Sequence, residues 1–327
     1  MRFVERLSTM VPTAFAVAIM VPGSAAAATL QPQTVRAWDA YVAATEARIA
    51  RELTSPRGFL ITDFSAGAAS ARMCVLNGQI AIGEMTAADR MGNTIDVPDG
   101  VISHWRGSVF LPGVALDTLL EQLQHPSERG PHQEDVLRLR VLERQPHQLR
   151  LFIRMTRTKI VTVTYDTEHR LDYHRHGRTR ASSRSVATRI VELDAAGSAN
   201  EREKPQGDDR GFLWRLNSYW RYEQIGGGVI VELESLTLSR SIPMGLGPIV
   251  RPIIDRIARE SIDRTLENIR RTYIPAASAR KDGQMMATAP SQRLQKTRYS
   301  TAAPADASFP PWRARSAYRR ARSAGRL

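Results

Sequence analysis

The sequence predicts an α+β protein in which a curved antiparallel sheet wraps around a long C-terminal helix. Two patterns carry this prediction. Between residues 135 and 239, apolar and polar residues alternate with a period of two through six segments, separated mostly by short turns, which is typical of an antiparallel meander. Residues 249–273 then place apolar side chains along one face of a helix of about seven turns. The concave face of the sheet is the obvious surface for this helix to cover.

An N-terminal extension of helix and hairpin is predicted over residues 29–100. Residues 31–54 carry apolar positions three and four apart, which indicates an amphipathic helix. Residues 59–64 and 73–82 are predicted as strands, the second interrupted by Asn77-Gly78, a strong hairpin signal. Cys74 would then lie in a buried strand, where cysteine behaves as a small apolar residue.

The main domain is predicted over residues 101–274. It begins with a strand and a short leucine-lined helix, continues through the six strands of the meander and ends in the long helix, with a polar loop before the last two strands. These elements are predicted at 101–111, 114–124, 135–144, 148–157, 159–174, 179–193, 211–225, 229–239 and 249–273, with the loop at 195–210.

The last two strands meet at three consecutive glycines, which allow two registers. A two-residue turn at Gly226-Gly227 would set Arg221 opposite Glu232 on one face, as a solvated ion pair, and Trp220 opposite Leu233 on the other. A three-residue turn would exchange the faces of one strand. The first register is favoured because it sorts apolar residues from charged ones, and the Trp220 face then forms the better wall for an apolar pocket.

The order of strand, short helix, six-strand meander and long terminal helix resembles the START-like helix-grip superfamily, also called SRPBCC. The run from Gly227 to Glu232, which leads through Ile242-Pro243 into the final helix, adds to this resemblance, which covers residues 101–273. The superfamily includes lipid-transfer domains, pollen-allergen-like proteins and aromatic polyketide cyclases. The resemblance implies a cavity between sheet and helix for an apolar or amphipathic molecule, and it brings no catalytic signature.

Three functions are open at this point. The first is an exported carrier or sensor that binds a lipid-like small molecule, with no cofactor, metal or chemistry of its own. The second is a cyclase- or hydrolase-type enzyme that uses pocket Tyr, His or Arg as acid–base groups. The third is a structural envelope protein whose cavity is filled by side chains. The candidate ligand contacts, which could equally be ordinary core, are Tyr165, Tyr173, Trp214, Trp220, Tyr222, Leu233, Ile253 and Ile257.

Two further groups of residues could suggest chemistry. His169, His174 and His176 are close in sequence, but arginines surround the last two and no carboxylate partner is evident, so a solvated hairpin tip is favoured over a metal site. Asp166 and Glu168 would share a strand face, like the paired carboxylates of some hydrolases. Their neighbours are polar, so a solvated face is the favoured interpretation.

Residues 1–28 are predicted to be a signal peptide. Two arginines lie within the first six residues, residues 10–21 are mainly apolar, and an alanine-rich stretch supplies a cleavage site after Ala28 or, alternatively, Ala26. An uncleaved anchor is the competing interpretation, but the apolar stretch is shorter than the roughly 20 residues that a span needs. The mature protein is therefore expected to be periplasmic or secreted.

The basic character of the chain is concentrated at its C-terminus. Of the net charge of +13, residues 275–327 carry +9, from eleven Lys and Arg against two Asp, which leaves about +4 for everything before them. The globular part is thus nearly neutral, and a specific nucleic-acid partner is not expected. The tail lacks periodicity and is predicted to be disordered. It is expected either to contact anionic membrane or envelope surfaces or to serve only solubility.

Overall fold

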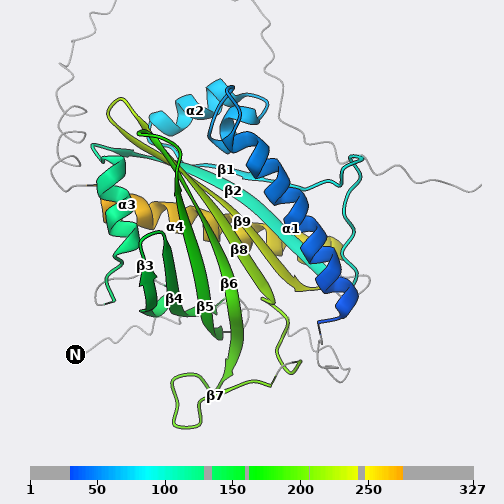
Figure 1. Cartoon of the computed structure of the whole chain (residues 1–327). Helices are drawn as coiled ribbons and strands as arrows, with labels where there is room; N and C mark the ends of the chain where they lie inside the picture. The colour runs from blue at the N-terminus through cyan, green and yellow to red at the C-terminus, as the bar shows by residue number, and fades with distance from the viewer. Residues whose placement is uncertain (1–29, 129–134, 159–161, 206, 242–246, 275–327) are drawn as a thin grey trace, which may run out of the picture. The chain divides into compact units, whose positions relative to one another are not determined.

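The computed structural model describes residues 30–128, 135–158, 162–205, 207–241 and 247–274, with side chains in the last range from residue 255. These residues form one antiparallel sheet with helices on both faces (Figure 1). The elements are α1 (Pro32–Leu53), η1 (Ile61–Phe64), α2 (Ala68–Leu76), β1 (Ala81–Glu84), β2 (Gly100–Pro112), α3 (Leu116–Gln124), β3 (Val136–Gln145), β4 (Gln148–Thr158), β5 (Thr162–Arg175), β6 (Arg180–Asp194), β7 (Arg202–Glu203), β8 (Arg215–Ile225), β9 (Gly228–Arg240) and α4 (Gly247–Tyr273).

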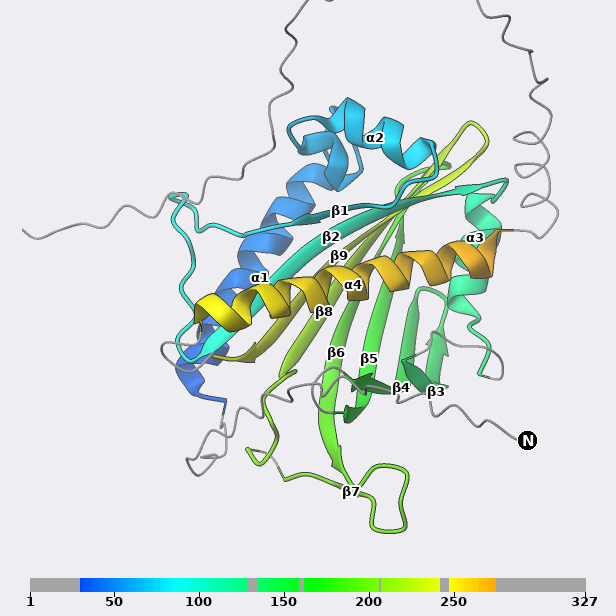
Figure 2. The same ribbon diagram turned by 180° about the vertical axis from the view of Figure 1, so that it is seen from behind.

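The sheet confirms the predicted meander. Its strand order is β1-β2-β9-β8-β6-β5-β4-β3, and the short β7 pairs with β6. The chain therefore starts at one edge, crosses through α3 to the other edge, and returns strand by strand until β9 pairs with β2. Helix α4 crosses one face of this sheet, and α1 lies on the other (Figures 1 and 2). We call the α4 side the concave face and the α1 side the convex face.

The predicted register of β8 and β9 is confirmed. Ile225 pairs with Gly228 across a two-residue turn, so that Trp220 lies opposite Leu233 and Arg221 opposite Glu232. Gly227 has a φ of 89°, which favours glycine. A Cβ on Gly228 would lie 2.2 Å from the carbonyl oxygen of Leu111 on β2. Glycine at this position therefore permits the close approach of β9 to β2.

The strand predicted at residues 59–64 is wrong. Phe59 and Leu60 are buried, as a strand would require, but the chain turns into the 3-10 helix η1. The cause is Asp63, whose carboxylate accepts hydrogen bonds from the backbone N–H groups of Phe59 and Leu60, each at 2.9 Å. Local side-chain acceptors of this kind compete with a strand for backbone donors.

The strand predicted at residues 73–82 is also wrong over most of its length. Helix α2 occupies its first half, and only β1 is extended. The dipeptide Asn77-Gly78 ends the helix: Gly78 has a φ of 83° and its N–H reaches the carbonyl of Val75. Glycine in this conformation serves a helix C-terminus as well as a hairpin. Cys74 accordingly lies half-buried on a helix.

Buried apolar residues form clusters on both faces of the sheet. The largest lies on the concave face and joins β2, β4, β5, β8 and β9 to α3 and to Ile262 and Leu266 of α4. Two smaller clusters lie on the convex face, one under α1 around Trp38 and the other around Phe59. Within the described ranges, none of the helices combines the length and apolar character that a bilayer span requires.

Candidate functional site

Helix α4 crosses one face of the curved sheet (Figure 2) and contacts strands on both sides of the sheet centre. On β2, next to the edge strand β1, Ile262 and Leu266 lie against Gly107, where a Cβ would come within 2.5 and 2.6 Å of their methyl groups. On the other side, Arg157 of β4, next to the edge strand β3, donates a hydrogen bond to Ser261 of α4 at 3.0 Å. A nearby carboxylate, that of Asp135, pairs with both Arg157 and Arg264. The central strands thus present their concave face to a helix that is held at two sides.

The concave face of the central strands is apolar, yet it retains accessible surface. Buried members of its cluster include Leu149, Leu151, Tyr173, Tyr222, Val231 and Leu233. Other side chains on the same face are only half-buried; the apolar ones are Trp105, Ile153, Leu171 and Trp220, and the hydroxyl-bearing ones are Ser185 and Ser218. Accessible apolar surface is the property that an apolar ligand would exploit.

Two tyrosine hydroxyls on this face are bound within the protein. The Tyr222 hydroxyl lies 3.1 Å from Ser183 Oγ, and burial raises the pKa of Tyr222. The Tyr173 hydroxyl donates to the carbonyl of Leu123 on α3 at 3.2 Å. Both rings contribute to the core, and both hydroxyls are already partnered.

A polar stretch follows on the same face of β5. Because side chains alternate along a strand, Tyr165, Thr167 and His169 share the concave face with Tyr173. His169 is 6% exposed and its Nε2 lies 3.0 Å from Thr167 Oγ1. Tyr165 is 3% exposed, and its buried hydroxyl has no hydrogen-bond partner among the described residues.

The eight residues selected from the sequence separate into three groups. Tyr165, Tyr173, Trp220, Tyr222 and Leu233 lie on the concave face. Trp214 instead packs in the convex cluster under α1, where its Nε1 donates to Asp209 at 3.0 Å. The alternation fails there because β8 begins only at Arg215, so Trp214 precedes the strand.

The structure describes the side chain of only one of the two residues selected on α4. Ile253 lies outside the described side chains, and Ile257 is half-buried but not part of the concave cluster. The cluster contains Ile262, Leu266 and Ile269 instead. Helical spacing alone predicted the stripe correctly but did not indicate which part of it meets the sheet.

The Arg221–Glu232 pair was predicted to be solvated, and this prediction is wrong. Arg221 is 1% exposed because α1 and η1 cover the convex face. Its guanidinium donates to Glu52 of α1 at 2.6 Å and to the carbonyl of Phe59 at 2.8 Å. A pair of opposite charges on neighbouring strands is usually solvated. Here the N-terminal extension covers the pair, and its Glu52 supplies a counter-charge that permits Arg221 to be buried.

Two neighbouring carboxylates of β9 complete this buried network and differ in pKa. Burial raises the pKa of Glu232, although it accepts hydrogen bonds from Ser108 at 2.8 Å and from the N–H of Thr62 at 3.1 Å. Burial acts in the same direction on Glu234, but its hydrogen bond with His104, at 2.7 Å, and the charge of Arg48 outweigh it and lower the pKa.

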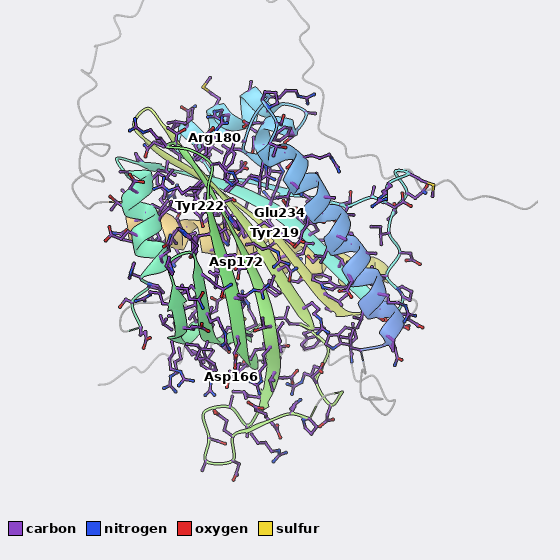
Figure 3. All side chains as sticks on the ribbon, in the orientation of Figure 1. Asp166, Asp172, Arg180, Tyr219, Tyr222 and Glu234 are labelled. Carbon is purple, nitrogen blue, oxygen red and sulfur yellow. The ribbon has the colours of Figure 1, made fainter. Side chains whose placement is uncertain are left out.

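Helix α1 is held by these same groups. Glu234 and Tyr219 lie beside α1 (Figure 3), where Tyr219 donates to Glu46 at 2.8 Å. His104 is bound on both ring nitrogens, to Glu234 and to the hydroxyl of Tyr41 at 3.0 Å. Since both ring nitrogens of His104 are engaged, we interpret the network as the attachment of the N-terminal extension to the sheet.

The histidines near the β5–β6 turn lie on different faces. His174 is exposed on the convex face, whereas His169 is buried on the concave face, so the predicted solvated tip does not describe His169. His176 packs against Phe59 with 5.4 Å between ring centres and contacts Ser182 at 2.8 Å. Alternation along β5 is the sequence signal that separates His169 from His174.

Asp166 and Glu168, on the convex face of β5, are paired with arginines. Asp166 is buried, in contrast to the predicted solvated position, because Arg154 binds both of its oxygens at 2.7 and 2.8 Å. Glu168 is half-buried, 3.4 Å from Arg150.

Two hollows of about 380 Å³ lie away from the concave face. One is beside the β3–β4 turn and includes Asp172, His174 and Arg184; the other is beside α2 and includes Asp63, Arg72, Arg180 and Glu223. In the second, Arg72 and Arg180 both pair with Glu223, at 2.7 and 2.9 Å. Polar or charged residues make up most of the lining of both hollows, so the concave face stays the candidate site.

No family model matches the sequence, and a search of curated proteins finds no match. Solved structures do show a likeness in fold. The STAR-related lipid transfer protein of Xanthomonas axonopodis is matched at 17% identity and a TM-score of 0.38, over 54% of this chain and 95% of that one. The Zhui aromatase/cyclase of Streptomyces sp. R1128 is matched at 10% identity and 0.37, over 53% and 94%. Human STARD10 is matched at 8% identity and 0.40, over 63% and 74%.

A likeness this distant concerns the fold alone. The strand order, and the terminal helix that contacts β2 and β4 across one face of the sheet, are observed in the chain itself. The α+β helix-grip fold predicted from the sequence is therefore confirmed by the chain's own architecture.

Proposed function

We propose that this protein binds an apolar or amphipathic small molecule between the sheet and α4, and that it acts after export as a carrier or sensor rather than as an enzyme. The observation that carries the proposal is the half-buried apolar surface on the concave face, the face that α4 crosses in Figure 2. Trp220 is the largest side chain of this kind on the central strands.

The energetics favour a lipid-like molecule. Burial contributes about 0.8 kcal/mol per methylene, so a ten-carbon chain would gain about 8 kcal/mol before the costs of association. The two hollows on the outer surface are lined mostly by polar or charged residues. The concave face is therefore the part of the described structure best suited to such a ligand.

Export and the role of the tail are proposals from the sequence. The two arginines, the apolar stretch and the alanine-rich cleavage site within residues 1–28 support secretion. The charge of +9 on residues 275–327 supports adhesion to anionic lipid surfaces, which would bring a carrier to its ligand's source.

The test is binding of an uncharged apolar dye, Nile red, followed by fluorescence. Ser218 lies on the concave face beside Trp220, so Ser218→Trp should occupy the space and weaken dye binding at least tenfold while the fold is kept. Thr188→Trp, at an exposed position of β6, is the matched control and should bind as the wild type does.

A filled cavity predicts a different result. Suppose that the wild type binds neither the dye nor any of a broad lipid panel, and that Ser218→Trp lowers the melting temperature by many degrees. The cavity is then filled by side chains, and the protein is a structural envelope protein rather than a carrier. Mass spectrometry of a bound ligand before and after incubation distinguishes a carrier from an enzyme. A carrier leaves the mass of the ligand unchanged, whereas an enzyme converts the ligand to a product.

A further inference from the structure

The polar stretch on β5 contains two buried side chains that each have a polar atom without a hydrogen-bond partner among the described residues, the hydroxyl of Tyr165 and one ring nitrogen of His169. His169 and Tyr165 are both more than nine-tenths buried. The Tyr165 hydroxyl has no hydrogen bond among the described residues, and the only hydrogen bond of the His169 ring within that part of the chain is the one to Thr167. Leaving a buried polar group unpaired is unfavourable, because the group has given up its hydrogen bonds to water. Unpaired groups on the face where a ligand is proposed are therefore candidate contacts with that ligand.

The hydrogen bonds determine which nitrogen of His169 carries the proton. Thr167 has one hydroxyl proton, and it is donated to the carbonyl of Ile153 at 2.9 Å. Thr167 Oγ1 can then only accept from His169, so Nε2 must be the protonated nitrogen. In the neutral ring Nδ1 is left as a bare acceptor. It has no hydrogen-bond donor among the described residues.

Both unpartnered groups are neutral. Burial lowers the pKa of His169 to about 4, so only about one molecule in a thousand is protonated at this position at pH 7. Burial also raises the pKa of Tyr165, with the charge of Glu192 as the second cause. Glu192 itself is paired with Lys204 and Arg210, each at 2.7 Å. A ligand would thus meet an uncharged acceptor and an uncharged hydroxyl.

We infer that the ligand carries an uncharged hydrogen-bond donor, a hydroxyl or an amide N–H, which donates to Nδ1 of His169, with Thr167 as the positioning residue that orients the ring. This inference rests on the proposed function and names the chemical class of its ligand. A free carboxylate has no proton to donate to Nδ1. An ether has none either, so both would leave the buried acceptor unpaired.

The test compares three 16-carbon probes as competitors of Nile red on the full chain at pH 8: hexadecanol, hexadecyl methyl ether and palmitate. The wild type should bind the alcohol about tenfold more tightly than the ether, and palmitate no more tightly than the ether. His169→Leu should abolish the preference for the alcohol while ether binding is kept. His174→Leu, on the exposed face of the same strand, should retain it.

Thr167→Val separates positioning from direct contact. It removes the acceptor that orients the ring and should reduce the preference for the alcohol while leaving ether affinity unchanged. Histidine ¹⁵N NMR supplies a readout that does not depend on these variants: in the free protein His169 should show a protonated Nε2 and a bare Nδ1, and hexadecanol should shift Nδ1.

The outcomes distinguish the two proposals. Absence of dye binding by the wild type overturns the proposed function and this inference with it. Equal binding of all three probes, or a preference for palmitate, leaves the proposed function standing and overturns the inference. A protonated Nδ1 in the free protein also overturns it.

Discussion

Acidification should destabilise this protein through His169. Burial lowers the pKa of its imidazole from 6.5 to about 4. Between these values the unfolded chain binds a proton that the folded protein excludes, so stability falls as the pH falls through this window. A difference of about 2.5 pKa units corresponds to about 3 kcal/mol, present above pH 6.5 and lost by about pH 4. Because His169 is 6% exposed, solvent screening reduces this figure little.

The assay is urea unfolding of the wild type and of His169→Gln at pH 7 and at pH 4. Carboxylates and the other histidines titrate in both proteins, so their effect cancels in the comparison. The stability gap between wild type and variant should shrink by about 3 kcal/mol on going to pH 4, because glutamine does not titrate. A gap that is the same at both pH values would show that His169 titrates normally and is not buried. His174→Gln is the control and should show no such change, since His174 is exposed.

Three further changes test other parts of the structure. Arg221→Ala should cost about 3–5 kcal/mol in urea unfolding, because it leaves the buried carboxylate of Glu232 without the charge of Arg221 and the carbonyl of Phe59 without its donor; a cost under 1 kcal/mol would mean that the convex face is solvated after all. Gly107→Val should displace α4, lowering the melting temperature and weakening Nile red binding together; a wild-type melting curve would refute the contact with Ile262. Truncation after residue 274 should leave the melting temperature unchanged while weakening salt-sensitive adhesion to anionic vesicles, and a drop of many degrees would show that the tail is docked. N-terminal sequencing of the secreted protein should begin near Thr29, and material beginning at Met1 in the membrane fraction would contradict export.

Strand alternation was the most informative signal in the sequence. It predicted the meander and the opposition of Trp220 and Leu233, both of which the structure confirms. It could also have separated His169 from His174, because residues five apart on one strand face opposite ways. These predictions succeed because the pleat is a local property of the backbone.

The failures lie where local signals have more than one solution. Asn77-Gly78 suits a hairpin or a helix end, since both need a positive φ at glycine. Phe59 and Leu60 looked like strand residues, but Asp63 captures their N–H groups. Trp214 has the right parity for the concave face, yet it precedes the strand and packs under α1.

The fold class, the meander with its short turns and the apolar stripe on α4 could all be predicted from patterns among residues close together along the chain. The β8–β9 register was the favoured one of the two that the three glycines allow, and the structure confirms it. That α1 and η1 cover the convex face, so that Arg221 is buried and not solvated, is known only from the three-dimensional structure. The same holds for Ile262 and Leu266 as the residues that meet the sheet. The physical reason is that the burial of a side chain depends on which other parts of the chain pack against it. Arg221 and Glu52 are over 160 residues apart in the sequence, and a contact between residues so distant produces no periodic pattern from which it could be predicted.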